Sequence, residues 1–480
     1  MTKAIRVLLF ALSVPVVSAP AQDKAARIDE VMSQYHEYRQ FNGSVLVADQ
    51  GNVIYKKGFG LANMEWNIPN TPETKFRLGS ITKQFTAAVV LQLVEEGKLR
   101  LEGRICDYLP EYPKKSGERV TIHQLLTHTS GIPSYTGLPD FFEKMSRDPY
   151  SPTDFLKVFS GLDFEFEPGS KFRYNNSGYF LLGAIIEKVS GESYEKVLQD
   201  RIFKPLNMKD SGYDLHKTIL SRRAAGYNRT LDGYENAPYL DMSLPYSAGS
   251  LYSTVEDLFL WDQALYADKP VSGRSKELMF KANLENYGYG LIIRKAPIIE
   301  GKNEVTTIGH GGGINGFNTL IERLVEDKHL IVLLNNTGGT RLGEMSQAIK
   351  NILYGAPVKN PLKPVSQVLY KTILEQDLAS AVKQYRELKA NQSAHYDFSW
   401  PELDMVGRHL LQAKKHNDAL EIFNLNVEAY PKIAAVYNSL GDAYREAGNK
   451  ELAVKNYARA LELNPGNRGL VDKIKTVVDK

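Results

Sequence analysis

The chain has 480 residues, of which 43% are hydrophobic and 24% charged, a composition that excludes disordered, collagen-like and disulfide-scaffold proteins and allows two or three globular domains. Its 59 lysines and arginines against 56 aspartates and glutamates leave a formal charge of +3, too balanced for a protein that binds nucleic acid through its bulk charge. The single cysteine, Cys106, excludes an intrachain disulfide and a thiolate metal cluster, and zinc spacings such as HExxH are absent from the sequence, so we expect no metal and no cofactor.

The first 21 residues have the pattern of a secretory signal peptide. Lys3 and Arg6 precede an apolar run from Val7 to Val17, and small residues follow up to Ala21. The run is shorter than the ~20 apolar residues of a membrane-spanning helix, and no later segment of the sequence reaches that length. We therefore predict that residues 1–21 are removed and that the mature protein is secreted or periplasmic, without an integral membrane segment.

The first elements of the mature chain predict a β-hairpin followed by a long buried helix. The sequences GSVLVAD (43–49) and VIYKKGFG (53–60) flank the turn residues Gln-Gly-Asn. Apolar residues then recur at helical spacing from Ser80 to Glu96, where a glycine ends the helix.

Helical patterns continue to about Leu206, and strand patterns return near the end of the body. Residues 317–325 and 329–335 predict two strands joined by a polar turn, and residues 341–353 predict a closing helix. Strands at both ends with helices between them predict one α+β body over residues 22–356, whose sheet is completed late in the chain.

After a linker predicted at residues 357–364, only helical patterns occur, over residues 365–480. Within this region residues 400–433 align without a gap with residues 434–467. The alignment superposes the kinds of residue that interlock paired helices: Leu403 on Tyr437, Val406 on Leu440, Gly407 on Gly441, Leu410 on Tyr444, Ala419 on Ala453, Phe423 on Tyr457 and Pro431 on Pro465.

This all-α region resembles tetratricopeptide repeats, which offer concave surfaces to protein partners. Two repeats are fewer than the ~3 needed for independent stability, so we expect helices at 366–389 and 468–478, or the body itself, to cap them. Two hypotheses remain open for this region: it recruits a protein partner, or it only stabilises the body.

Three S-x-x-K sequences place a serine hydroxyl and a lysine amine on one face of a helix, where the amine can take the serine proton. They are Ser80–Lys83, Ser193–Lys196 and Ser380–Lys383, and roughly two such pairs are expected by chance. Ser193 is expected to cap a helix, and Ser380 falls in the helical tail. Only Ser80 follows a glycine and opens an apolar helix, which makes Ser80–Lys83 the candidate nucleophile pair.

Two further segments carry candidate polar groups. Tyr174-Asn175-Asn176 precedes a helix, and a phenol with a reference pKa of about 10 needs a nearby cation such as Lys83 to act as a base. His310 precedes glycines 311–313 in a predicted strand; such a run indicates the close approach of a ligand or of another backbone, and the histidine can hold a carboxylate or donate a proton. A packed aromatic and a plain glycine turn also explain these segments when each is taken alone.

The order of these motifs, S-x-x-K, Y-x-N and HGG, resembles the serine β-lactamase and penicillin-binding-protein superfamily, in the branch of class C β-lactamases, D-alanyl-D-alanine carboxypeptidases and serine esterases. Connecting segments are similar too: LLTHTSGIP (125–133), YNNSGYFLLGAIIEKVSG (174–191), SAGSLYSTVEDLFLW (247–261) and YGYGL (287–291). The resemblance covers about residues 24–356. It implies a β-lactamase/transpeptidase-like α+β fold, an antiparallel sheet flanked by helices with an all-helical lobe.

The resemblance also implies an acyl-enzyme mechanism. Ser80 attacks an amide or ester carbonyl, Lys83 and Tyr174 share the general-base work, and Asn176 orients the substrate or Lys83. The N–H groups of Ser80 and Gly313 form the oxyanion hole.

In the same strand, His310 and Gly312 are expected to contact the substrate. Many members of the superfamily carry lysine at the position of His310 and a hydroxyl residue at that of Gly311, so the chain resembles carboxypeptidases, D-aminopeptidases and esterases more than efficient β-lactamases. His123 and His128 are interpreted as structural.

We predict a secreted serine hydrolase for a small-molecule or short-peptide substrate of D-amino-acid peptide, ester or β-lactam type. A Gly-x-Ser-x-Gly elbow is absent from the sequence, which argues against an α/β-hydrolase. The alternative is a catalytically weak or inactive peptide-binding protein whose repeats recruit a protein partner.

Overall fold

The computed structural model describes residues 19–139, 141–297, 304–465 and 467–479. The predicted signal peptide falls mainly on residues 1–18, outside the described residues, and its last three residues begin the first helix, α1 (Ala19–Glu37). Among the described helices we find none whose length and apolar character would carry it through a bilayer.

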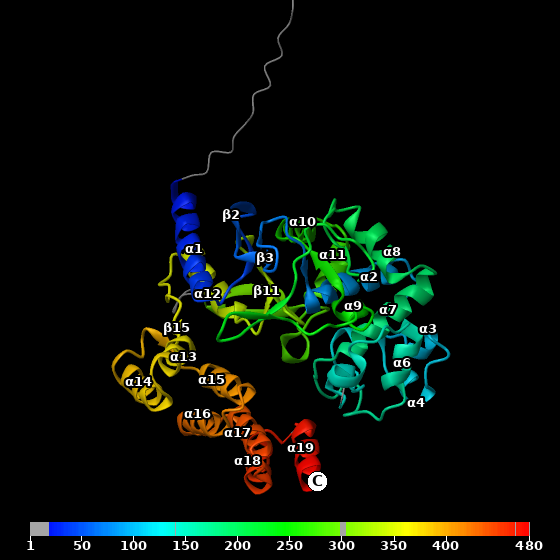
Figure 1. The fold of residues 1–480 in the computed structure, drawn as a ribbon. Helices are drawn as coiled ribbons and strands as arrows, with labels where there is room; N and C mark the ends of the chain where they lie inside the picture. Colours follow the sequence, from blue (N-terminus) through cyan, green and yellow to red (C-terminus); the bar gives the residue numbers. More distant parts are fainter. Residues whose placement is uncertain (1–18, 140, 298–303, 466, 480) are drawn as a thin grey trace, which may run out of the picture.

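A six-stranded antiparallel sheet forms the centre of the body, and its strands come from both ends of the sequence (Figure 1). In spatial order they are β10 (Ile292–Pro297), β11 (Glu304–Ile314), β12 (Phe317–Leu324), β13 (His329–Asn335), β1 (Gly43–Asp49) and β2 (Asn52–Phe59). Gly43 on β1 lies opposite Phe59 on one side and Asn335 on the other. The predicted hairpin, the two late strands and their union in one sheet are confirmed.

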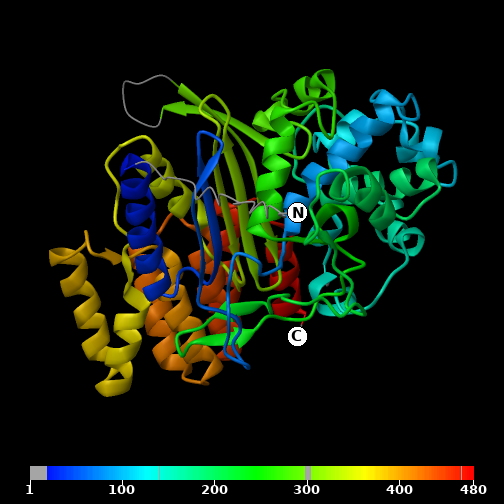
Figure 2. The same cartoon turned by 90° about the horizontal axis from the view of Figure 1, so that it is seen from above.

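Both faces of the sheet are buried at its inner strands β12, β13 and β1, whose successive side chains point to opposite cores. On β1, Leu46 and Ala48 join the core that contains α2 (Thr82–Glu95) and α10 (Val255–Tyr266). Val45 and Val47 join the core that contains α1 and α12 (Leu342–Leu353), the closing helix predicted at 341–353. Figure 2 shows α1 and α12 on one side of the sheet and the helical lobe on the other.

The lobe holds most of the remaining body helices. They are α3 (Ile105–Tyr108), α4 (Lys114–Gly117), α5 (Ile122–Leu126), α6 (Pro152–Ser160), α7 (Asn176–Ser190), α8 (Tyr194–Leu198), α9 (Tyr246–Gly249) and α11 (Gly273–Met279). Single-turn segments are η1 (Gly79–Ile81), η2 (Tyr135–Gly137), η3 (Phe141–Met145), η4 (Gln199–Phe203) and η5 (Leu284–Asn286). Short strands of the body are β3 (Leu61–Asn63), β4 (Ile68–Pro69), β5 (Phe76–Arg77), β6 (Gly212–Tyr213), β7 (Tyr227–Arg229), β8 (Tyr234–Asn236), β9 (Leu251–Ser253) and β14 (Thr337–Gly338).

The C-terminal domain is helical apart from one short strand pair, β15 (Lys363–Pro364) with β16 (Tyr396–Asp397). Its helices are α13 (Val365–Glu375), α14 (Leu378–Asn391), α15 (Trp400–Gln412), α16 (His416–Ala429), α17 (Ala434–Glu446), α18 (Lys450–Leu463) and α19 (Arg468–Val478). A Cβ on Gly407 would lie 2.7 Å from the ring of Phe423, and a Cβ on Gly441 would lie 2.6 Å from the ring of Tyr457. The two repeats therefore interlock their helices at the same aligned positions.

The two ends of the repeat array are covered. Leu470 and Val477 of α19 share a core with Tyr457 of α18, and α13 packs beside α15. Leu231 of the body is part of the core of the repeats. Figure 1 shows the array below the body, so the terminal helices and the body lie where caps were expected.

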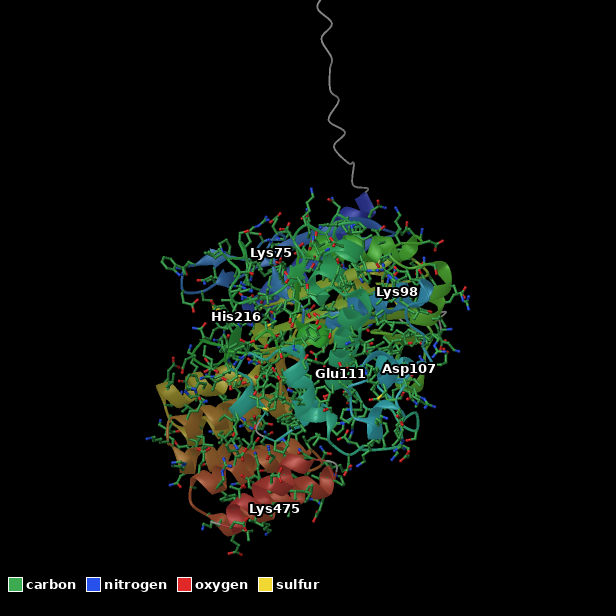
Figure 3. All side chains as sticks on the ribbon, turned by 90° about the vertical axis from the view of Figure 1, so that its right-hand side faces the viewer. Lys75, Lys98, Asp107, Glu111, His216 and Lys475 are labelled. Atoms are coloured by element: carbon green, nitrogen blue, oxygen red, sulfur yellow. The ribbon has the colours of Figure 1, made fainter. Side chains whose placement is uncertain are left out.

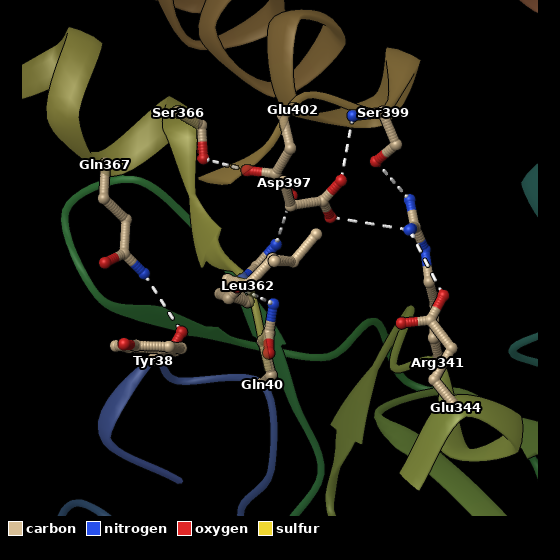
Figure 4. A network of polar contacts seen from close by, with 11 residues as sticks. Tyr38, Gln40, Arg341, Glu344, Leu362, Ser366, Gln367, Asp397, Ser399 and Glu402 are labelled. Atoms are coloured by element: carbon tan, nitrogen blue, oxygen red, sulfur yellow. Dashed lines mark hydrogen bonds and ion pairs between the residues drawn. The ribbon is translucent and has the colours of Figure 1, made fainter. Parts of the chain in front are cut away.

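A network of polar contacts crosses the junction between body and repeats (Figure 4). Arg341 Nη2 donates to Ser399 Oγ at 2.7 Å, and Gln367 Nε2 donates to the Tyr38 carbonyl at 3.1 Å. Arg229 of β7 lies 3.3 Å from Glu402 of α15. Such an interface is more polar than the core of a single domain, which is typical of two domains in contact.

The outer surface carries both signs of charge, as in Figure 3, where Lys98, Asp107, Glu111 and Lys475 project from the ribbon. Across the described residues we find no group of three or more His, Cys, Asp or Glu side chains placed to hold a metal ion.

Candidate active site

Ser80 lies in η1, at the point where the chain enters α2 and runs against strand β11. Gly79 precedes it with φ +55°, a left-handed conformation that favours glycine. A Cβ on Gly79 would lie 3.0 Å from Gly313 N. The backbone around Ser80 and that of Gly313 are therefore neighbours, as an oxyanion hole built from these two residues requires.

Position 312 requires a glycine because another backbone segment passes too close to leave room for a side chain. A Cβ on this residue would lie 1.9 Å from the Leu78 carbonyl oxygen and 2.2 Å from Thr319 Oγ1. Thr319 Oγ1 donates to the same carbonyl at 2.7 Å, which fixes the segment before Ser80 on the sheet. The glycine run was expected to lie against either a ligand or another backbone segment, and at Gly312 it lies against a backbone segment.

Lys83 is fully buried, three residues after Ser80 in the same helical segment. Its Nζ lies 3.1 Å from Ser80 Oγ, 2.9 Å from Asn176 Oδ1 and 2.8 Å from the Ala248 carbonyl oxygen. No carboxylate is among these partners. Burial therefore holds the pKa of the Lys83 amine well below its ordinary value, which favours the neutral form.

Asn176 is the first residue of α7, and its side chain is held from both ends. Its Oδ1 faces Lys83, and its Nδ2 donates to Thr136 Oγ1 at 3.1 Å. Asn175 caps the helix, with its Oδ1 accepting from Gly178 N at 2.8 Å. Of the two roles left open for Asn176, the structure therefore shows a contact with Lys83.

Tyr174 covers the same amine, with Lys83 Nζ 4.9 Å from its ring centroid. Although Tyr174 is 37% exposed, desolvation by its surroundings raises the pKa of its phenol, and a hydrogen bond with Ser80 offsets part of that rise. Because the phenol stays protonated near neutral pH, Tyr174 carries a proton that it can donate.

His310 is a neutral, fixed side chain. Its Nδ1 donates to the Gly311 carbonyl at 2.5 Å, so its Nε2 accepts from the Tyr287 hydroxyl at 3.0 Å. Burial and the nearby Lys83 lower the pKa of His310 to about 3. Without a charge or a free nitrogen, His310 cannot hold a substrate carboxylate as a lysine would.

His128, expected to be structural, lies directly under Tyr174. Their ring centroids are 4.3 Å apart, and His128 Nδ1 accepts from Asn175 N at 3.1 Å. Burial holds the pKa of His128 well below its ordinary value, which keeps the ring neutral. His123 instead contacts Tyr289, with Nδ1 and the phenol oxygen 2.8 Å apart.

Two cavities open at Ser80. One, of about 410 Å³, lies between the lobe and the start of β12. Its lining is mixed: asparagine, serine and threonine side chains stand beside apolar ones, namely Tyr135, Phe141, Phe142, Leu240, Leu244 and Phe317. The other, of about 420 Å³, follows β11 past Tyr174 and His310. Ser80 is thus reached from two sides, which suits a substrate with a group on each side of the scissile bond.

The other S-x-x-K pairs lie elsewhere. Ser193 caps α8, its Oγ accepting from Lys196 N at 3.3 Å, and Lys196 bonds to surface carboxylates. Lys383 on α14 is 79% exposed. A second Y-x-N sequence, Tyr234-Glu235-Asn236, forms strand β8 and pairs with β7 in a hairpin.

Sequence motifs pointed to Ser80, Lys83, Tyr174, Asn176, His310, Gly312 and Gly313, and the structure brings all seven to one place. They did not indicate the Ala248 carbonyl, Thr136 or Tyr287. Ala248 and Tyr287 lie in segments that resemble the superfamily, SAGSLYS and YGYGL, but a carbonyl acceptor has no side-chain pattern to reveal it.

Comparison with known proteins agrees with this geometry. The β-lactamase family model matches residues 28–353, and the tetratricopeptide repeat model matches residues 434–467, the second predicted repeat. Penicillin-binding protein 4* of Bacillus subtilis is 32% identical over 72% of this chain and 80% of its own, and the teichoic acid D-alanine hydrolase of Staphylococcus aureus is 26% identical over 67% and 77%. The octameric penicillin-binding protein homologue of Pyrococcus abyssi superposes with a TM-score of 0.61 and 31% identity, over 73% of this chain and 82% of that one. This chain belongs to the β-lactamase family of serine hydrolases and carries a tetratricopeptide repeat in its C-terminal domain.

Proposed function

We propose that the protein is a secreted serine hydrolase that forms an acyl-enzyme on Ser80 and cleaves an amide or ester bond. The observation that carries this proposal is the set of partners around Lys83. Asn176 Oδ1 and the Ala248 carbonyl only accept hydrogen bonds, so they take both hydrogens of a neutral amine. The remaining lone pair then faces Ser80 Oγ at 3.1 Å, where it can accept the serine proton.

In this mechanism Lys83 is the general base for acylation. Ser80 Oγ forms a bond to the substrate carbonyl carbon while its proton moves to Lys83 Nζ. The N–H groups of Ser80 and Gly313 stabilise the developing oxyanion. Tyr174, protonated and hydrogen-bonded to Ser80, donates a proton to the leaving group and recovers it from Lys83.

The substrate is proposed to carry an apolar group beside the scissile bond. The cavity of about 410 Å³ at Ser80 has a mixed lining, whose aromatic and aliphatic part suits such a group. His310 is neutral, so no fixed cation stands there for a carboxylate. These features, with the similarity to a D-alanine hydrolase, favour a D-amino-acid amide or ester over a β-lactam.

The proposal includes removal of residues 1–21, location outside the cytoplasm, a hydrolase domain over 22–356, a linker at 357–364 and a repeat domain over 365–480. Mass spectrometry of the N-terminus of the exported protein tests the first two parts. An intact Met1 on exported protein would contradict cleavage.

Labelling with a fluorophosphonate or penicillin probe tests the catalytic assignment. Wild type is expected to be labelled on Ser80 and Ser80→Ala to stay unlabelled. Ser193→Ala changes the same motif at the surface and serves as the matched control, with labelling equal to wild type. Lys83→Ala should slow labelling by about 10² or more, the usual contribution of a general base.

Equal labelling of wild type and Ser80→Ala would refute the assignment. A protein that hydrolyses no ester, D-amino-acid amide or β-lactam but binds a peptide saturably would instead support the alternative of an inactive peptide-binding protein.

A further inference from the structure

A third cavity, of about 440 Å³, lies at the junction of the body and the repeats; we call it the interdomain cavity. One wall belongs to the body and includes Gln40, Arg229 on β7 and Thr337 on β14. The other wall belongs to α15 and includes Asp404 and Arg408. Its volume is within the range of small-molecule binding sites, ~300–1,000 Å³.

Four of the lining side chains carry a buried polar atom that has no hydrogen-bond partner within the described part of the chain. These atoms are Gln40 Oε1, Arg229 Nη1, Thr337 Oγ1 and Asp404 Oδ1. Thr337 and Asp404 are only 3% and 9% exposed. A fold seldom leaves buried polar atoms unpaired, so water or a ligand in this cavity is the natural partner for these four.

Two of these groups are already held in place by their other atoms. Arg408 Nε donates to Asp404 Oδ2 at 2.7 Å, and Arg229 Nη2 lies 3.3 Å from Glu402. The free Oδ1 of Asp404 and Nη1 of Arg229 therefore have fixed positions. The body wall therefore offers a donor, Arg229 Nη1, and the α15 wall offers an acceptor, Asp404 Oδ1.

The interdomain cavity adjoins the active site. It shares three lining residues with the cavity of about 410 Å³ at Ser80: Asn228, Gly338 and Gly339. Thr340 lines both this cavity and the one beside Tyr174 and His310.

We propose that the interdomain cavity is a distal substrate subsite, which binds the polar continuation of a peptide whose scissile bond lies at Ser80. The proposal rests on the proposed function. It assigns the repeat domain to the substrate-binding site, because α15 forms one wall of the subsite.

A peptide matches the chemistry of the lining. Its backbone alternates N–H donors with carbonyl acceptors, which are the complements of Asp404 Oδ1, Gln40 Oε1 and Arg229 Nη1. The lining carries charges of both signs: Arg39, Arg229, Arg341, Arg408, Glu235, Glu344, Asp397, Glu402 and Asp404. Such a balance gives no attraction for a polyanion and suits a polar, uncharged chain.

A ladder of peptides tests the proposal. The shortest member is an apolar D-amino-acid amide, and longer members add one, two or three polar residues such as serine, on the acyl side or on the leaving-group side. Affinity is measured by calorimetry on full-length Ser80→Ala, and kcat/KM on the wild type. Extension on one side is expected to raise affinity and kcat/KM about tenfold, as one or two added hydrogen bonds would.

Variants on both walls locate the gain. Asp404→Asn changes the repeat wall, and Thr337→Val changes the body wall by replacing an unpaired hydroxyl with a methyl group. Each should reduce the ratio of long-peptide to short-peptide affinity by about threefold, because the two walls share the expected tenfold gain. Glu428→Gln makes the same charge change as Asp404→Asn at an exposed site on α16 and should leave the ratio unchanged.

The outcomes separate the two proposals. If the short amide is hydrolysed but extension on neither side has an effect, or if the effect survives both Asp404→Asn and Thr337→Val, the distal subsite is refuted and the hydrolase stands. If peptides bind with the expected length dependence but none is cleaved and no probe labels Ser80, the subsite stands as a peptide site and the hydrolase is refuted.

Discussion

Gly312→Ala should disable the active site by displacing the segment that carries Ser80. The added Cβ would lie 1.9 Å from the Leu78 carbonyl oxygen, whereas such contacts are normally above 3.0 Å, so the two backbones must part by about 1 Å. Leu78 is two residues before Ser80 and bonds to Thr319 Oγ1, so the shift is transmitted to the nucleophile. A misplacement of about 1 Å commonly costs ~10²-fold in rate.

The free energy of unfolding should fall as well, by about 1–3 kcal/mol, the usual cost of overpacking a buried site. Probe-labelling rates give the first quantity, and urea unfolding followed by circular dichroism gives the second. Gly311→Ala is the matched control on the same strand, because its Cβ would have its nearest contact, Thr319 O, at 3.6 Å. Wild-type labelling and stability in Gly312→Ala would refute the close approach of Leu78 to β11.

Three further outcomes are expected. Burial lowers the pKa of Lys83, so labelling of Ser80 should hold near neutral pH and fall on acidification as the amine gains a proton, and a labelling rate that increases on acidification would contradict this. Because the folded state disfavours the protonated amine, the contribution of Lys83 to the free energy of unfolding should rise with pH until the pH reaches the ordinary pKa of lysine. Gly407→Ala and Gly441→Ala should each lower repeat stability by about 1–3 kcal/mol through contact with Phe423 and Tyr457, while Gly343→Ala, whose Cβ meets nothing within 4 Å, should change stability little in the same thermal melts. Gly311→Ser adds a hydroxyl, in open space, to the cavity that Ser80 also lines, and should leave the melt unchanged while raising penicillin acylation by up to about tenfold. An unchanged acylation rate would show that the missing hydroxyl is not what disfavours β-lactams.

Local patterns predicted most of the secondary structure because both cores are built from regular periodicities. The alternation of Val45, Leu46, Val47 and Ala48 between two cores follows from the period of a strand. The helix after Ser80 follows from apolar spacing, and the setting of that serine distinguished it from Ser193, which caps a helix.

Tertiary contacts decided what the patterns left open. The glycine run on β11 was compatible with a ligand or a backbone, and only the position of Leu78 assigns Gly312 to a backbone. The sequence allows His310 to act as a proton donor, but the Tyr287 hydroxyl and the Gly311 carbonyl occupy its two ring nitrogens. The Ala248 carbonyl, 165 residues from Lys83 in sequence, accepts a hydrogen bond from the Lys83 amine, and no local pattern encodes that contact.

The pairing of β1 with β13 has a consequence for how the chain folds. Strand β1 pairs with β2 on one side and with β13 on the other, where Gly43 lies opposite Asn335. The central sheet therefore cannot close until β13, and with it nearly all of the body, has been synthesised. The closure entropy of so large a loop must be overcome before the sheet contacts stabilise anything, which makes folding slow and leaves the hydrophobic faces of β1 exposed in the meantime. The nascent protein therefore passes through an aggregation-prone interval that ends with the arrival of its last sheet strand.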